Sequence, residues 1–388
     1  MSYVSSNANR WYCAKESAYG VIAAISATNR IPAVGMTAQV QLAKSQRKDK
    51  TGTRTWAGLP QGMRTQTSFD LKSYMRDWAD PTTLPPHGPL FEAAMGQPGN
   101  LWTGGTPTSA TTSSIVFAAP HGLNPGQGVV SNGEIRFVAA VADPTTIVLN
   151  APFSSAPVPG LPIGPTATYA LTSALPSVTL YDYWDPSTAL QRVISGAAVD
   201  QTTIKLNGDF HEFGFRGSAQ DIIDSASFTA GQGGASAFPP EPAVAAYTYS
   251  PVPGNLGEVW LGVIPNQFLT VSSASVQIKN NIDMLAKQFG TSQPQGIAPG
   301  QREVSMSLEL FSGDDINTLS IYQAARQRSP MGVMFQLGQV GGQLLGIYLT
   351  SVVPVVPEFD DSQNLLQWKF ENSRAQGTSD NEIVIAFG

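Results

Sequence analysis

The chemically reactive side chains of this chain are few and widely separated. Its three histidines lie in unrelated settings, His87 in PPHGP, His121 in APHGL and His211 in a strand-like stretch. A catalytic triad or a metal site needs several such groups in a defined constellation. Motifs for phosphate binding, zinc proteolysis or a nucleophile elbow are absent from the sequence. The sequence therefore predicts no catalytic residue, no metal and no cofactor.

Three pairs of carboxylates could in principle serve acid–base chemistry. Asp221 and Asp224 in QDIIDS have a spacing that would allow two carboxyl groups to cooperate, but no histidine, lysine or nucleophile neighbours them. Asp314-Asp315 precedes a helical pattern and is more typical of a helix cap. Asp360-Asp361 lies in a turn before NLLQW. Structural roles account for the last two pairs, and the missing neighbours disfavour a catalytic role for Asp221 and Asp224.

A long loop concentrates positive charge and is followed by one aromatic residue. Its members are Lys44, Arg47, Lys48, Lys50, Arg54 and Trp56. Such a loop could be solvated and mobile, or it could be an arm that contacts acidic groups on another copy. Nucleic-acid binding is the weakest interpretation, because stacking on bases needs more aromatic residues than Trp56 alone.

The composition favours short strands, turns and association. Only 13% of the 388 residues are charged, which is about half the usual share. The 37 glycines and 29 prolines indicate many turns. A surface with few charges is weakly protected against association. The net charge of −6 argues against general affinity for nucleic acids, which requires basic patches.

Cysteine content and apolar runs bound the cellular setting. Cys13 is the only cysteine, so the chain forms no internal disulfide, which suits a protein that matures in a reducing cytosol. We see no signal-peptide pattern at the N-terminus and no apolar run of the ~18 residues that span a membrane. The sequence predicts no membrane segment.

Alternating and helical patterns outline the elements that position these side chains. Period-two alternation predicts strands at Met36–Leu42, Thr67–Tyr74 and 303–311. Short helices are predicted in GPLFEAAMG and INTLSIYQAARQR. We expect a first module from residues 1–103 and 175–228, an inserted small β domain at 104–174, a linker at 229–255 and a second module at 256–388.

The two predicted modules repeat each other. A shift of 155 residues aligns DFHEFGFRGSAQ with NLLQWKFENSRAQ. The order of strand, long loop, strand, short helix and three further strands occurs twice, with Arg64 and Arg302 at matching ends of the long loops. We expect the matched apolar positions to form the core of both repeats: Phe69, Leu71, Val178, Leu180, Phe213 and Phe215 in the first, and Leu308, Leu310, Val333, Phe335, Trp368 and Phe370 in the second.

Several blocks of sequence resemble those of phage tail tube proteins of the long-tailed, non-contractile kind. They are AKESAYGVIAA, TRTWAGLPQGMRTQTSFDLKSYM, DFHEFGFRGSAQDIIDSASFTAGQGG, IYQAARQRSPMGVMFQLG and VPEFDDSQNLLQWKFENSRAQG. The resemblance implies a mainly β fold of two tandem tail-tube-like β-sandwich modules, each with a short flanking helix, plus the inserted β domain facing outward. Inner strands would come from 69–75, 304–311, 345–353 and 365–370.

The same resemblance implies a structural virion protein without enzymatic activity. Three chains would form a pseudo-hexameric ring, because each chain supplies two modules. Rings would stack through the loops at 43–66 and 287–302 into a tube that conducts DNA without binding it specifically. Assembly would occur in the host cytoplasm, with tape measure, tail terminator and tail-tip proteins as partners.

Two other functions stay open at the level of sequence. The chain could be a carbohydrate-binding or adhesive β protein that uses the inserted domain. A cell-wall hydrolase that uses Asp221 and Asp224 is disfavoured by the missing catalytic constellation.

Overall fold

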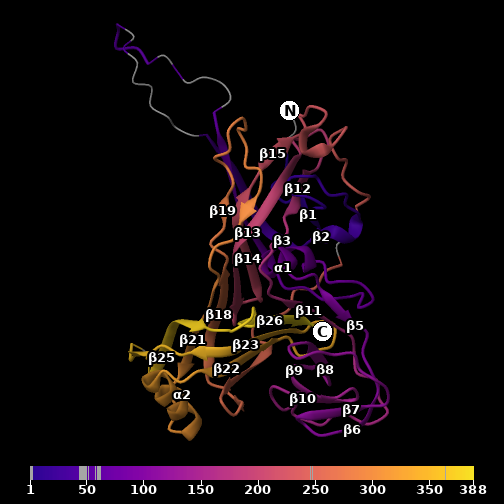
Figure 1. The fold of residues 1–388 in the computed structure, drawn as a ribbon, viewed down its shortest axis with the longest axis vertical. Coiled ribbons are helices and arrows are strands. Elements are labelled where there is room, and N and C mark those ends of the chain that lie inside the picture. The colour runs from indigo at the N-terminus through magenta and orange to yellow at the C-terminus, as the bar shows by residue number, and fades with distance from the viewer. Residues whose placement is uncertain are drawn as a thin grey trace.

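The structure, a computed structural model, describes residues 3–42, 50, 52–56, 58, 63–244, 246, 248–362 and 364–388. It is mainly β and elongated, with the first module above the second and the inserted domain beside the second module in Figure 1. This confirms the predicted fold class.

One antiparallel sheet runs through both modules. Its strands follow the order β3 (Ala33–Leu42), β4 (Thr65–Tyr74), β14 (Glu212–Ala219), β13 (Arg192–Leu206), β18 (Val271–Lys279), β21 (Glu303–Phe311), β25 (Gln367–Ala375) and β24 (Glu358–Asp360). The first four strands belong to the first module and the last four to the second. The modules therefore meet where β13 pairs with β18. We call this the shared sheet.

A second layer of strands covers one face of the shared sheet in each module. In the first module it contains β1 (Asn9–Lys15), β12 (Val178–Trp184), the first half of β13 and β15 (Asp221–Asp224). In the second it contains β16 (Gly257–Gly262), β22 (Met331–Leu337), β23 (Leu345–Val353) and β26 (Ile383–Phe387), extended by β11 (Thr166–Ala170) and β5 (Asn100–Trp102).

Alternating apolar residues fill the space between the two layers. Every second residue of β18 and β21 is buried from Ala274 and Val304 onward, as period-two alternation requires. All twelve residues predicted as the repeat core are buried in one hydrophobic cluster. Aromatic rings continue the core across the modules, since Phe91 contacts Phe213, Phe215 and Phe387 at centroid distances of 5.3–5.5 Å.

Each module has one helix, but the two helices differ in exposure. Helix α1 (Gly88–Met95) is buried along nearly its whole length between the modules. Helix α2 (Ile316–Gln327) begins at Asp315, whose carboxylate accepts hydrogen bonds from the amides of Asn317 and Thr318, as predicted for a cap. Apart from Thr318, Ile321 and Ala325, its residues are at least partly exposed.

The two modules share the same strand connectivity. Each strand pairing of the first module has an equivalent in the second. The pair β1–β12 corresponds to β16–β22, and β12–β13 corresponds to β22–β23. Likewise β3–β4 corresponds to β18–β21, β4–β14 to β21–β25, and β13–β15 to β23–β26. The long strand β13 corresponds to β23 and β24 together, because β23 pairs with β22 and β24 pairs with β25. The predicted order of elements therefore recurs in space.

Irregularities in the ladders show which residues correspond. A bulge between Val178 and Leu180 matches one between Met331 and Val333. The sequence alignment of Val178 with Val333 is thus displaced by two residues in this strand. A bulge at Ala33/Gly35 likewise matches one at Val271/Ser273, so Val40 corresponds to Ile278. Aligning the similar stretches VQL at 40–42 and VQI at 276–278 by sequence would instead pair Val40 with Val276, two residues earlier. A two-residue shift preserves the inward and outward alternation, so apolar patterning could not reveal it.

The inserted domain has a sheet of its own. It consists of β6 (Pro107–Ala110), β7 (Ser114–Phe117), β10 (Thr146–Leu149), β9 (Glu134–Asp143) and β8 (Gly128–Ser131). Strand β11, which the sequence placed in the same domain, instead pairs with β5 and β26. Trp102 lies opposite Thr166, so the chain leaves and re-enters the second layer at neighbouring positions.

The predicted linker packs against the first module along part of its length. Val252 is buried, and Pro251 and Pro253 form bridges with Arg76 and Phe210. The remaining short elements are β2 (Arg30–Ile31), β17 (Asn266–Gln267), β19 (Asp283–Met284), β20 (Ile297–Ala298) and two 3-10 turns at Ala27–Asn29 and Gln232–Gly234.

Candidate assembly interface

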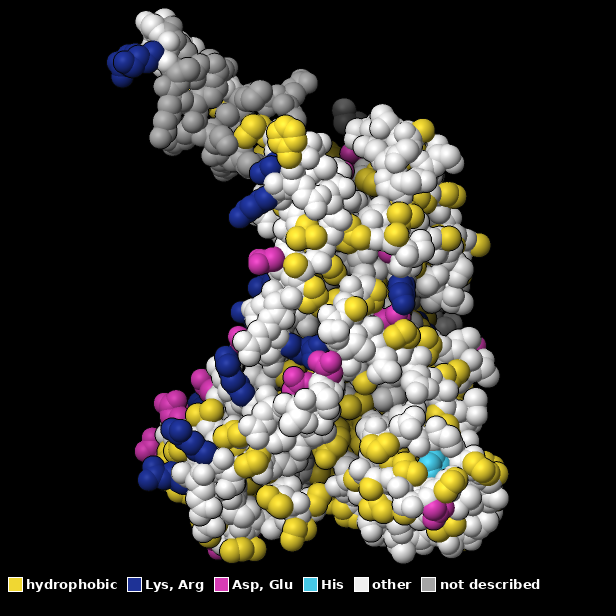
Figure 2. Space-filling model, in the orientation of Figure 1, with side chains coloured by type: hydrophobic (Ala, Val, Ile, Leu, Met, Phe, Trp, Pro, Cys, Tyr) yellow, Lys and Arg dark blue, Asp and Glu magenta, His cyan; other side chains and the backbone are white. Residues whose placement is uncertain are grey.

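The shared sheet turns a polar face away from the core. Its charges come in neighbouring pairs of opposite sign: Arg216 with Asp70 at 2.7 Å, Lys205 with Glu212 at 3.4 Å, Lys369 with Asp360 at 2.5 Å and Arg374 with Glu303 at 3.0 Å. Figure 2 shows both signs interspersed along the side formed by β21 and β25. Exposed pairs of this kind add little stability, but they neutralise cations that would otherwise attract phosphates.

The junction between the modules buries side chains from both of them. Ile204 lies opposite Val276 and Thr202 opposite Ile278, and all four side chains are buried. Just after the end of β18, the side-chain amide of Asn280 donates to the carbonyl of Ala94 in α1, at 2.9 Å, and to that of Val199 in β13, at 3.1 Å.

Backbone N–H groups that follow β18 extend this junction beyond the end of the strand. The Asn280 amide N–H donates to the carbonyl of Asp200 at 2.7 Å, and the Ile282 amide N–H donates to the Asp200 carboxylate at 2.7 Å. Hydrogen-bonded polar groups of this kind favour one placement of the two modules, because another placement would leave these groups without partners. We call this contact the internal junction.

Each end of the shared sheet carries an open strand edge. Among the described residues, β3 pairs only with β4 along this sheet, and β24 only with β25. Apolar side chains are exposed at both ends, with Val40 42% and Phe359 54% accessible. Unpaired strand edges with exposed apolar residues are sites for adding another strand.

The equivalent positions at the internal junction are covered. By the bulge correspondence Val40 matches Ile278, which is 1% exposed. Phe359 matches Ile204, also 1% exposed, because Phe359 lies opposite Trp368 as Ile204 lies opposite Phe213. The same positions are therefore buried where a neighbouring module is present and exposed where none is.

An aromatic cluster lies beside the open edge of the second module. Tyr322 of α2, Phe359 and Trp368 have ring centroids 5.4–6.0 Å apart, and Phe359 stacks on Trp368. The neighbouring side chains Ile316 and Leu319 are exposed. In the first module the corresponding helix is covered by β11 and β26, so α2 lacks the cover that α1 has.

The residues predicted for a stacking loop are placed in different ways. Lys44, Arg47 and Lys48 lie outside the described residues. Lys50, Arg54 and Trp56 are exposed, on a stretch that lies apart from the two modules (Figure 1).

The two arginines that end the long loops hold local structure. Arg64 donates to the carbonyls of Lys287 and Gln288, at 3.1 and 3.2 Å, and so joins the first loop to the second. Arg302 is mostly buried and pairs with Asp380 at 3.0 Å and Glu382 at 3.6 Å. These contacts are distinct from Lys50, Arg54 and Trp56, the members of the basic loop that the structure describes.

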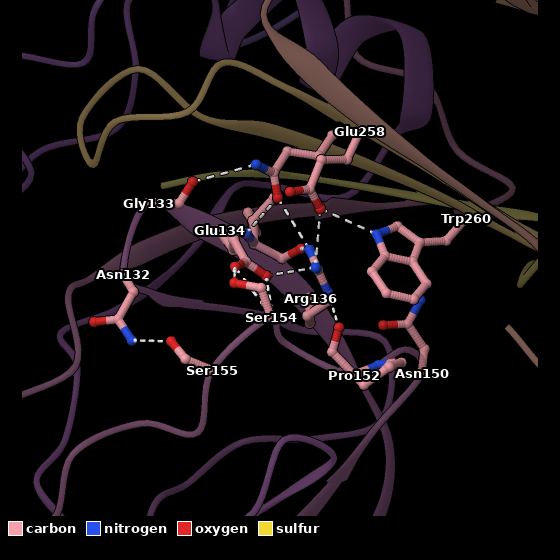
Figure 3. Close-up of polar contacts among 12 residues, drawn as sticks. Asn132, Gly133, Glu134, Arg136, Asn150, Pro152, Ser154, Ser155, Glu258 and Trp260 are labelled. Carbon is pink, nitrogen blue, oxygen red and sulfur yellow. Dashed lines mark hydrogen bonds and ion pairs between the residues drawn. The ribbon is translucent and has the colours of Figure 1, made fainter. Parts of the chain in front are cut away.

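Sequence patterns gave no indication of a buried charge cluster between the inserted domain and the second module. The side chain of Arg136 is fully buried and donates to Glu134, Glu258 and Gln336 at 2.6, 3.0 and 3.0 Å (Figure 3). Burial lowers the pKa of Arg136, and the two carboxylates counter that effect. Val130, Ile135 and Phe137 complete the contact against Met334, Tyr348, Val384 and Ala386.

The carboxylates and histidines considered for catalysis have structural surroundings. Asp221 accepts a hydrogen bond from Gln293, while Asp224 caps a turn by accepting from the amides of Ala226 and Ser227. His87 bonds Ser73 at 2.9 Å within the core, and burial lowers its pKa to about 3. The described residues contain no cluster of three or more groups that could hold a metal.

Of the predicted inner strands, three lie in the shared sheet, as parts of β4, β21 and β25, whereas residues 345–353 form β23 of the second layer. Within the described chain, neither helix has the length and apolarity needed to cross a membrane.

Twin β sandwiches that share one sheet and leave an edge open at each end define a modular β-sheet protein. Comparison with known families narrows this class, because residues 7–363 match the family described as phage tail tube protein. The chain belongs to this family, which makes it a structural component of phage tails. No curated protein matches it.

Proposed function

We propose that three copies of this chain close into a pseudo-hexameric ring and that the rings stack into the tube of a long, non-contractile phage tail. The main support for this proposal is that equivalent positions of the two modules differ in solvent exposure. Ile278 and Ile204 are covered at the internal junction, whereas Val40 and Phe359 are open at the two ends of the shared sheet. Two halves of one interface on opposite ends of a subunit join copies head to tail, and such a chain of subunits closes into a ring when the rotation between neighbours completes a full turn.

In this ring the polar face of the shared sheet lines the lumen. Its paired charges, such as Arg216 with Asp70, offer little free positive potential to a passing phosphate backbone. DNA then moves from capsid to host without being held. The inserted domain lies on the far side of the second layer, where it leaves the bore open. The chain works by assembly and not by catalysis, in the virion tail after assembly in the host cytoplasm.

Contacts between rings use the loops at 43–66 and 287–302. Arg64 joins the end of the first loop to the second through the carbonyls of Lys287 and Gln288, which supports a shared role for the two loops. Deleting residues 45–57 should leave a folded subunit whose rings no longer stack. The ends of the tube contact tape measure, tail terminator and tail-tip proteins.

Electron microscopy of the purified chain tests the proposal. We expect rings with six lobes from three chains, at a mass of three subunits by mass photometry, without added ligand. A chain that stays monomeric at all concentrations and binds glycans would instead support the carbohydrate-binding alternative, which the family assignment does not favour.

A further inference from the structure

The internal junction provides a template for the contact between two copies. Its register is defined residue by residue, with Thr203 opposite Gln277, Ile204 opposite Val276 and Lys205 opposite Ser275. A ring that alternates internal and intermolecular junctions needs nearly the same strand geometry at both, because sheets tolerate little distortion in spacing and twist. The inference below rests on the ring assembly proposed above.

Two independent correspondences transfer this register to the open edges. On one side, the bulges at Ala33/Gly35 and Val271/Ser273 equate β3 with β18. On the other side, β24 pairs with β25 in the register that the end of β13 has with β14, so Phe359 takes the place of Ile204. Tracing the ladder across both modules gives the same equivalence of β3 with β18 as the bulges do.

We propose that β24 of one copy adds to β3 of the next with Glu358 opposite the partner subunit's Gln39 and Phe359 opposite the partner subunit's Ala38. Glu358 and the partner's Gln39 then lie on the polar face, as Thr203 and Gln277 do. Phe359 points into the core, and the aromatic cluster with Tyr322 and Trp368 becomes buried.

The same register places different chemistry at the end of the strand. Asn280 and Asp200, which are hydrogen-bonded in the internal junction, correspond to Leu42 and Val355. Both of these are exposed in the single chain, at 63% and 45%. At this position the intermolecular junction thus has an apolar contact in place of the hydrogen-bonded pair of the internal junction. Burying apolar surface favours association without requiring preformed hydrogen-bond partners, which suits surfaces that meet only after folding.

Two prolines fit this division. Pro354 and Pro357 stand where β13 has Val199 and Thr202, and they interrupt the strand between β23 and β24. Proline donates no backbone hydrogen bond and is confined to edge strands. Fewer backbone bonds can form at this junction than at the internal one, so side-chain burial has to supply more of its stability.

Paired cysteines test the register directly. The only native cysteine, Cys13, is buried, so it does not compete. Residues directly opposite have Cα atoms about 4.5–5.5 Å apart, whereas a shift of two residues gives about 7–8 Å, beyond the reach of most disulfides. We would combine Glu358→Cys with Gln39→Cys, and compare it with the matched pairs Glu358→Cys/Gln41→Cys and Glu358→Cys/Thr37→Cys. All four positions are exposed.

With assembled rings under mild oxidation, we expect the Gln39→Cys pair to form covalent dimers and trimers at least tenfold faster than either control. Faster cross-linking through Gln41→Cys, which the uncorrected sequence alignment would place opposite Glu358, would overturn the proposed register. Faster cross-linking through Thr37→Cys would do the same. Neither result would contradict the ring assembly. Rings in which no pair reacts overturn the strand addition. Loss of rings from the unmodified chain would instead count against the proposed function.

Discussion

The outer faces of the two modules are covered by unrelated parts of the chain. In the first module, Tyr12, Tyr181, Tyr183 and Val193 lie beneath Ile22, Ile25 and Phe238, which come from the N-terminal segment and the predicted linker. In the second, the inserted domain supplies the cover. A sheet face must be buried by something, but the covering element need not be repeated with the strands.

The polar contacts of the two covers also differ in depth. Arg10 pairs with Glu241 at 2.5 Å in the first module, and both side chains retain some exposure. Arg136 pairs with Glu134 and Glu258 in the second and has no exposure at all. The inserted domain thus packs against the second module, although its residues interrupt the first. Four experiments would break or sharpen this comparison.

Removing the inserted domain should have the largest effect. Replacing residues 104–164 by Asn-Gly keeps β5 and β11 adjacent but uncovers Met334, Val384 and Ala386. Each large buried side chain contributes about 1.5–3 kcal/mol, so we expect an insoluble or dye-binding chain with its thermal transition lost or broadened. An unchanged transition by calorimetry would make the domain a decoration.

Breaking the buried ion cluster should cost less than removing the domain. Arg136→Met leaves two carboxylates without their cation, which in buried pairs costs about 3–5 kcal/mol. Denaturant unfolding should show this loss. The triple variant with Glu134→Gln and Glu258→Gln should recover part of it. Arg10→Met is the matched control in the first module and should cost about 1 kcal/mol, because its pair is more exposed.

Equivalent positions at the two junctions should respond in opposite ways. Asn280→Ala removes hydrogen bonds to Ala94 and Val199 and should lower the free energy of unfolding by about 1–3 kcal/mol. Leu42→Ala should leave the stability of the single chain unchanged within about 0.5 kcal/mol and weaken assembly, measured by sedimentation. Equal loss of chain stability in both variants would contradict the distinction.

Lowering the pH from about 6.5 to about 5.5 should weaken the first module with the smallest effect of the four. His87 has its pKa lowered to about 3 by burial, so the unfolded chain binds a proton between the ordinary value near 6.5 and 3 while the folded chain does not. Its contribution is full above pH 6.5 and declines as the pH falls, by up to about 1.4 kcal/mol per pH unit. His87→Gln should flatten that slope between about pH 6.5 and 5.5 in urea titrations, where the expected effect is about 1 kcal/mol.

Sequence patterns predicted much of the fold because its strands are regular. Alternation in Thr65–Tyr74 and Glu303–Phe311 is unbroken, and the helix cap at Asp315 has a local cause. Residue equivalence was harder, since a shift by two positions preserves which face is apolar. Only the bulges, which depend on backbone geometry, separate Val333 from Met331 as the counterpart of Val178.

The assembly surface could be predicted only in outline. The basic residues of the first long loop stand out in sequence, yet Arg302 proved to hold Asp380 and Glu382 within its own module. The exposed Val40 and Phe359 look like ordinary core residues in sequence, because exposure depends on which module lies beside them. The Arg136 cluster joins residues far apart in the chain, which no local pattern records.

Strand β26 lies between β11 and β23, and Phe387 contacts Phe91. The ribosome makes this strand long after helix α1 and β11. Until residues 383–387 have been made, β11 lacks its strand partner on that side, and the aromatic side chains of α1 lack the contact with Phe387. The packing of the first module against the second is therefore complete only after synthesis has passed both.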